Sequence, residues 1–376
     1  MKKMEEPSSP TQQTCSQNPS LPDDLLMSCL ARVSRLYYPT LSLVSKSFRS
    51  LLASPELYKA RSLLGHTESC LYVYLESSYE YGLYTLCRKP DQTLTLANKE
   101  KKKKSSKYVL VKVPTHDSLR TGFFVYVAVG SDIYSIGSGS SYRHPPPSCR
   151  VEVLDCRSHT WHEAPSTQVD YTSLSASVID RKIYVAGSHG ISSKKSSSFE
   201  VFNTETQIWD PLPPISCSQT KHRSACFDGK FHVETDQVVF CYNSKESRWD
   251  RAELPVDSAV FSNPSCCQVE NVLYYVSQGG EIMWCDTKIG VWRKLRGFIR
   301  LPKFHLCVRL VGYGGKMAVL WEEAGSISSG EKKIWCAEIA LERRGSCEIR
   351  GKVEWSDHVL TVPASYSIVK VLAPTV

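Results

Sequence analysis

A repeat built around tryptophan constrains the fold of this chain more than any other feature of its sequence. Four short apolar segments each end in Asp or Asn, and a tryptophan follows six residues later. The four pairs are Asp155 with Trp161, Asn203 with Trp209, Asn243 with Trp249, and Asp286 with Trp292. These tryptophans are 48, 40 and 43 residues apart, and a fifth, longer unit ends at Trp355, 63 residues further on. Such a period predicts stacked structural repeats.

Each unit also contains a second apolar run upstream of the first. These runs lie at 132–134, 182–185, 230–233 and 273–276, and three units close with a proline at Pro165, Pro213 or Pro255. We expect each Asp or Asn to cap a turn between two strands. An indole at a fixed point of each unit can bury about 200 Å² against the neighbouring unit. Because a lone four-stranded sheet cannot cover both of its faces, the pattern favours blades stacked radially in a β-propeller.

Residues 20–64 have a helical period instead. Ser20 is a candidate cap for a first helix, with Pro22 in its first turn. Pro39 can begin a second helix and Pro55 a short third one, each with apolar residues at three- and four-residue steps. Three short helices bury little apolar surface, so we expect this unit to be completed by a partner.

Residues 1–19 are polar and contain three prolines, which predicts a disordered leader on an intracellular protein. The sequence contains no apolar run of about 18 residues, which argues against a membrane-spanning helix. The fifteen cysteines include no C-x-x-C pair, which favours reduced thiols over disulfides or structural zinc. His159 and His162 lack a third nearby ligand, so we expect no metal site there.

The net charge is +8, and six lysines between 99 and 107, less Glu100, supply +5 of it. This run is either a solvated loop or a nuclear-import signal, so cytoplasm and nucleus both stay open. It has no interleaved aromatic residues, which disfavours nucleic-acid binding.

The repeat resembles the kelch motif, whose units fold as propeller blades, over about residues 120–362. The usual double glycine is replaced by Gly137-Ser138 and Ala186-Gly187 in two units. Residues 21–26 and 41–51, with Phe48 in place of the usual tryptophan, resemble an F-box. The combination is similar to the plant F-box/kelch-repeat proteins. That resemblance implies a substrate receptor of an SCF ubiquitin ligase, with the F-box on a Skp-type adaptor, the adaptor on a cullin, and the propeller on a protein substrate.

The domain organisation that we expect is an F-box at 20–64 and a propeller at 70–376. Blade-like units lie at about 122–166, 173–214, 221–255, 262–297 and 305–362. Strands within 70–114 supply a further blade, which a C-terminal strand at 366–372 can close. This gives a mainly β fold with a three-helix F-box and six blades, or five if the first set of strands is not counted.

Seven apolar residues of the F-box are our candidates for adaptor binding, although several of them can equally hold the helices together. They are Leu21, Pro22, Leu25, Leu26, Leu43, Val44 and Phe48. The tryptophans and their paired Asp and Asn residues are assigned structural roles. For the substrate, the candidates are propeller loops, because loops carry specificity. They are Ser138–Pro147, His189–Ser198, Gly279–Gly280 and Ala324–Lys333.

No local catalytic motif or cofactor site stands out. The sequence lacks G-x-S-x-G, and Gly312–Gly315 lacks the Lys-Ser/Thr of a phosphate loop. The resemblance likewise implies that ubiquitin transfer belongs to partner proteins. Two alternatives remain: a scaffold whose F-box does not direct degradation, and a propeller enzyme or ligand sensor whose site is assembled across blades.

Overall fold

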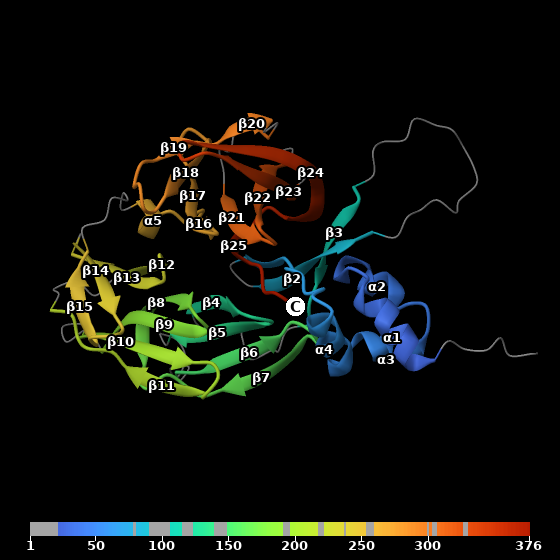
Figure 1. The fold of residues 1–376 in the computed structure, drawn as a ribbon, viewed down its shortest axis with the longest axis horizontal. Coiled ribbons are helices and arrows are strands. Elements are labelled where there is room, and N and C mark those ends of the chain that lie inside the picture. The colour runs from blue at the N-terminus through green and yellow to red at the C-terminus, as the bar shows by residue number, and fades with distance from the viewer. Residues whose placement is uncertain are drawn as a thin grey trace, which may run out of the picture.

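The computed structural model describes residues 22–77, 80–89, 106–114, 123–138, 149–190, 196–216, 222–236, 238–252, 259–298, 301–302, 307–325 and 330–376. In this part of the chain, a helical unit precedes six sheets arranged around a common centre (Figure 1), and all their strand pairs are antiparallel except one at the edge of the last sheet. The prediction of a mainly β chain with a six-bladed propeller and an N-terminal helical unit is therefore confirmed.

The helical unit differs in detail from the three helices that the sequence predicted. Its elements are α1 (Asp23–Ala31), the 3₁₀ turn η1 (Arg35–Tyr37), α2 (Tyr38–Leu41), α3 (Lys46–Leu52) and α4 (Pro55–Leu63). The expected second helix is split, because the Ser45 hydroxyl accepts the backbone N–H of Phe48 and starts α3 anew. The N-cap of α1 is Pro22, and Ser20, the predicted cap, lies outside the described residues.

Every blade contains four strands in meander order from the centre outward, and the last blade has an extra edge strand. The first three blades are β25 (Ser367–Leu372), β1 (Tyr72–Glu76), β2 (Tyr81–Arg88) and β3 (Tyr108–Lys112); β4 (Phe123–Val129), β5 (Asp132–Ser138), β6 (Val151–Asp155) and β7 (Thr160–Ala164); and β8 (Tyr171–Ile179), β9 (Lys182–His189), β10 (Ser196–Asn203) and β11 (Ile208–Pro211).

The fourth and fifth blades are β12 (Arg223–Phe227), β13 (Lys230–Thr235), β14 (Val238–Asn243) and β15 (Arg248–Arg251); and, after α5 (Ala259–Ser262), β16 (Cys267–Val269), β17 (Val272–Val276), β18 (Ile282–Asp286) and β19 (Arg293–Lys294). The sixth blade is β21 (Val308–Tyr313), β22 (Lys316–Ala324), β23 (Glu331–Arg344) and β24 (Glu348–Pro363), with β20 (Arg296–Phe298) parallel to the edge of β24.

The C-terminal strand closes the ring. β25 pairs antiparallel with β1 and so becomes the innermost strand of the first blade, although it is the last strand of the chain. It contacts β21 of the sixth blade on one side and β4 of the second blade on the other. The final residues continue this closure, since Val376 and Glu68 exchange two backbone hydrogen bonds of 2.9 Å. The two ends of the propeller chain thus hold each other in place.

The spacing of six residues between Asp or Asn and tryptophan follows from one turn geometry. In each turn the side-chain oxygen accepts the backbone N–H two residues on, at 2.8 Å for Asp155 and 2.9 Å for Asn203. The fourth residue after it has positive φ, as at His159 (57°) and Gln207 (60°). In the second, third and fourth blades the next strand begins at once and the tryptophan is its second residue, whereas in the fifth blade Trp292 comes just before β19.

Apolar side chains fill the space between blades rather than a single centre. Six buried clusters lie one between each pair of adjacent blades, and the cluster between the first and second blades also includes the helical unit. Stability therefore depends on each blade having a neighbour on both sides.

Three of the indoles join neighbouring blades through a hydrogen bond that the sequence pattern did not reveal. The Nε1–H of Trp209 donates to the carbonyl oxygen of Pro165 at 2.8 Å, and that of Trp249 donates to Pro213 at 2.7 Å. Trp161 donates in the same way to Pro114 at 3.1 Å. Each acceptor is the residue that closes the preceding blade. The prolines of the repeat are thus partners of the tryptophans.

The remaining two tryptophans have other surroundings. Pro255, the matching proline for Trp292, lies outside the described residues. Trp355 lies in the middle of β24 rather than at the end of its unit, which continues to Pro363. Its Nε1–H donates to Glu338 at 2.8 Å, and its ring stacks on Tyr108 of the first blade with centroids 4.1 Å apart. Trp355 therefore joins the sixth blade to the first.

Replacing Trp209 with phenylalanine tests the indole–proline link. Trp209 is buried, and Trp209→Phe removes both the hydrogen bond and part of the ring, so we expect the free energy of unfolding to fall by about 1–3 kcal/mol. Trp161→Phe is the matched control and is expected to cost less, because Trp161 is only partly buried and its bond is longer. Urea denaturation curves measure both. Equal losses would contradict this account of the difference.

Candidate functional site

The helical unit is packed directly on the propeller. Leu30, Leu52 and Leu57 belong to the same buried cluster as Tyr72 and Leu154 of the first and second blades. The Tyr58 hydroxyl donates to the carbonyl oxygen of Arg157 at 2.8 Å, in the turn between β6 and β7. The two units therefore form one continuous core in which the helices have a fixed position relative to the blades.

A buried arginine holds this junction together. Arg61 is 2% exposed and donates to the carbonyl oxygens of Ala31, Val33 and His66 at 2.6–3.1 Å. Its Nη2 also forms a 2.9 Å ion pair with Glu68 on the segment that leads into β1. One side chain thus links α1, α4 and the first blade.

The predicted adaptor-binding residues fall into two groups. Leu25, Leu43 and Val44 are 52%, 74% and 63% exposed, and Pro22 is exposed as well. Leu25 lies on α1, and Leu43 and Val44 lie in the turn between α2 and α3. Large apolar side chains this exposed are free to enter an interface.

The second group packs inward. Leu26 and Phe48 are partly buried and contact the cluster that joins the helices to the propeller. Leu21 lies outside the described residues. Sequence reasoning left core and interface equally open for Leu25 and Phe48, and the structure places them in different environments: Leu25 is mostly exposed and Phe48 is half-buried.

The four candidate substrate loops begin and end at one rim of the propeller. They connect β5 to β6, β9 to β10, β17 to β18 and β22 to β23, which are the second and third strands of their blades. Because equivalent strands of a propeller run in the same direction, these connections all lie at the same end of the blades. Parts of three loops, 139–148, 191–195 and 326–329, lie outside the described residues.

The helical unit sits at the opposite rim. The chain passes from α4 into the start of β1, a second strand, and the helices contact the turn between β6 and β7. Both features lie at the end of the blades away from the connections between second and third strands. The candidate loops and the helices are thus on opposite ends of the propeller.

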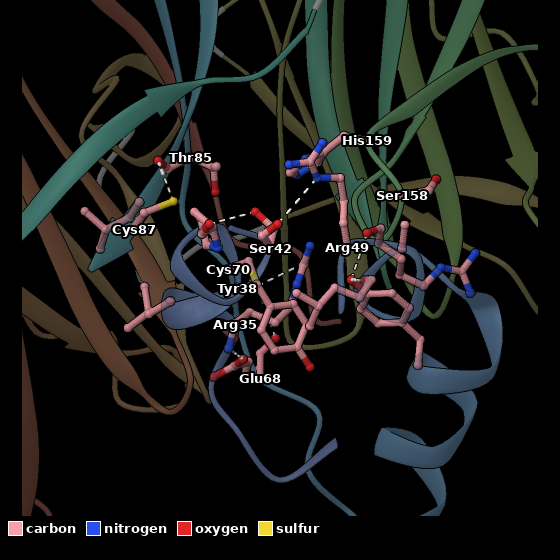
Figure 2. Close-up of a pocket in the computed structure, with 18 of the residues that line it drawn as sticks. Arg35, Tyr38, Ser42, Arg49, Glu68, Cys70, Thr85, Cys87, Ser158 and His159 are labelled. Carbon is pink, nitrogen blue, oxygen red and sulfur yellow. Dashed lines mark hydrogen bonds between the residues drawn. The ribbon is translucent and has the colours of Figure 1, made fainter. Parts of the chain in front are cut away.

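A cavity of about 250 Å³ lies between the helical unit and the propeller. Figure 2 shows side chains from both sides around it. Arg35, Tyr38, Ser42 and Arg49 come from the helices, and Thr85, Cys87, Ser158 and His159 come from the blades. The sequence analysis did not single out this cavity. Arg35, a cation within an apolar helical pattern, is the signal that could have indicated it.

Of the two histidines considered for a metal, His159 has another partner. His159 Nε2 is hydrogen-bonded to the Tyr72 hydroxyl at 2.7 Å, and burial, together with the nearby positive charge of Arg35, lowers the pKa of His159 to about 4. In the part of the chain that the structure describes, no group of three His, Cys, Asp or Glu side chains is arranged to hold a metal ion. The lysines at 99–104 lie outside the described residues.

Comparison with known protein families gives one match for the helical unit and one for the propeller. Residues 19–60 match the F-box domain family, and residues 83–360 match the family described as FKB95, Kelch-repeats domain. The second match alone covers well over half of the chain. The chain belongs to the F-box/kelch-repeat family.

Similar proteins extend over almost the whole length of this F-box/kelch chain. F-box/kelch-repeat protein At5g51250 of Arabidopsis thaliana is 56% identical over 94% of this chain and 98% of its own length. F-box/kelch-repeat protein At3g06570 of the same plant is 49% identical over 95% of this chain and 93% of its own length. Their names describe the same pairing of units. Among the described residues, no helix is long and apolar enough to cross a membrane.

Proposed function

We propose that this protein is the substrate-recognition subunit of an SCF-type ubiquitin ligase. The F-box would bind a Skp-type adaptor and through it a cullin, and the propeller would bind a protein that is to be ubiquitinated. F-box domains generally bind such adaptors. In this proposal the chain contributes no chemistry of its own, and ubiquitin transfer is left to the partners.

The observation that carries the proposal is the exposed apolar group Leu25, Leu43 and Val44 on a helical unit that is otherwise packed on the propeller. These side chains contribute little to the core, so the free-energy cost of exposing their apolar surface to water is removed only when a partner covers them. An adaptor with an apolar groove fits this chemistry.

The opposite rim is the proposed substrate surface. The candidate loops lie at the end of the propeller that faces away from the F-box, so a bound substrate and a bound adaptor would not compete for the same surface. Because the F-box and the blades share one core, the distance between the two surfaces is fixed by the fold. A fixed distance is what a receptor needs to present its substrate reproducibly.

The double variant Leu43→Asp/Val44→Asp tests the adaptor surface. Two carboxylates in an apolar interface are expected to weaken binding of a purified Skp-type adaptor at least about a hundredfold. Biolayer interferometry measures the dissociation constant, and circular dichroism confirms that the variant is folded.

The matched control is Leu63→Asp at the end of α4. Leu63 is 80% exposed but is not among the proposed adaptor contacts, so the same kind of change there should leave binding intact. Full adaptor binding by the double variant would overturn the assignment of the surface. A scaffold would behave differently. It would bind the adaptor, but the lifetime of the protein bound to the propeller would be the same whether or not the F-box is present.

A further inference from the structure

The cavity between the F-box and the propeller has an unbalanced positive charge. Arg35 lines it, and the Nε of its guanidinium is shielded from solvent and has no hydrogen-bond partner among the described residues. The other two nitrogens donate to neutral groups, the Cys156 carbonyl oxygen at 2.7 Å and the Cys70 sulfur at 3.4 Å. A partly buried guanidinium in such surroundings is costly unless an anion pairs with it.

The neighbours of Arg35 do not supply that anion. Burial raises the pKa of Cys87 to about 11 and that of Tyr58 to about 12, so these side chains are neutral near pH 7. Burial also raises the pKa of the Cys70 thiol. The thiols and hydroxyls of the cavity therefore supply no negative charge, and the Tyr58 ring, whose centroid is 5.3 Å from the Arg35 guanidinium carbon, offers Arg35 only its π face.

The one carboxylate in the cavity lining is already shared. Glu68 accepts the backbone N–H of Arg35 and forms its ion pair with Arg61 at 2.9 Å. The single negative charge of Glu68 is thus shared by two arginines, Arg35 and Arg61. Arg157 is paired with Asp155, whereas Arg49 forms no ion pair with any described residue and donates only to the Ser42 carbonyl oxygen, at 3.4 Å.

We infer that this junction cavity is a binding site for a small organic anion, a carboxylate or a phosphate monoester. The oxyanion would lie against the guanidinium of Arg35, with Arg49 as a second cation. The apolar part of the ligand would lie against Tyr38, Leu52 and Leu86, which also line the cavity. A volume of about 250 Å³ is below the range usual for drug-sized ligands, so the ligand is small.

The position of the site gives the ligand a role at the joint between the two units. Arg35 and Arg49 belong to the F-box, whereas Thr85, His159 and Tyr313 belong to three different blades. A ligand that contacts both sides binds only when the F-box is docked, and so it stabilises the docked arrangement. This inference does not depend on adaptor binding or on ubiquitin transfer.

The test uses the full-length protein with benzoate and phenyl phosphate as probes, and with benzamide as a neutral probe of the same size as benzoate. Calorimetric titration and thermal unfolding in buffer free of other oxyanions measure binding. We expect at least one anion to bind and to raise the Tm, since a ligand at a hundredfold excess over its Kd shifts the folding equilibrium about a hundredfold. Benzamide should not bind. Absence of binding by both anions, or equal binding of benzamide, overturns the proposal.

Three variants locate the site. Arg35→Gln removes the guanidinium and is expected to weaken binding of the anion at least about tenfold. Ala53→Phe fills the cavity from the end of α3 without removing a side-chain hydrogen bond, and it should abolish binding even if Arg35→Gln fails to fold. Arg32→Gln makes the same charge change on an exposed arginine whose side chain, among the described residues, bonds only to Ser28, and this variant should bind the anion as the wild type does. Wild-type affinity in Ala53→Phe places the anion elsewhere and contradicts the inference.

Discussion

A chain that ends at Ser365 is expected to lose cooperative unfolding altogether. Removal of 366–376 deletes β25, the innermost strand of the first blade, and leaves the backbone of β1 unpaired on one side. It also removes Ile368 and Val371 from the cluster between the sixth and first blades. Each such buried aliphatic side chain contributes about 2–5 kcal/mol, so the loss is comparable to the whole stability of a domain.

Urea denaturation followed by tryptophan fluorescence checks this expectation. Point substitutions in β25 give a graded control: Ile368→Ala should cost about 2–5 kcal/mol, whereas Val369→Ala should cost less than about 1 kcal/mol because Val369 is partly exposed. A truncated chain that unfolds at the wild-type midpoint would show that ring closure is not needed for stability.

The second large effect is expected from Arg61→Met. The substitution leaves the carbonyl oxygens of Ala31, Val33 and His66 without their donor and Glu68 without its ion-pair partner. Removing one partner of a buried charge pair typically costs about 3–5 kcal/mol. We expect the free energy of unfolding to fall by this amount, with early loss of helical signal in far-ultraviolet circular dichroism.

Arg32→Met is the control for this prediction, because Arg32 is exposed on the helical unit and its side chain bonds only to Ser28 within the described part of the chain. It should change the free energy of unfolding by less than about 0.5 kcal/mol. If the two variants unfold alike, the network around Arg61 does not hold the F-box to the propeller.

Much of the propeller could be predicted because its signals are local and repeated. Asp155 and Asn203 cap turns of the same geometry, so the spacing to tryptophan is the same in both units. The helical unit was harder to predict from the sequence. Whether one helix runs through Ser42–Ser45 or a new helix starts there depends on the hydroxyl of Ser45, which caps α3. This cap competes with a continuous helix over a single turn. A helical period alone does not decide that competition.

The adaptor surface could be predicted only in part, because periodicity does not distinguish an apolar side chain in a core from one at an interface. Leu26 and Phe48 share the apolar character of Leu43 and Val44, yet the first two pack against the buried cluster at the junction with the propeller and the other two are exposed. The docking of the helices on the blades decides this difference. Nothing in the local sequence of the helices specifies which blade they contact.

The amino-acid sequence by itself determined the repeated strands, their turns and the helical start of this F-box/kelch protein, because these depend on residues within a few positions of one another. Tertiary structure alone decided that Trp209 bonds to Pro165, that the candidate loops begin and end at the rim away from the F-box, and that Arg35 lines a cavity. These features join residues that are tens to hundreds of positions apart, and their contacts form only when the ring closes and the helices dock on it.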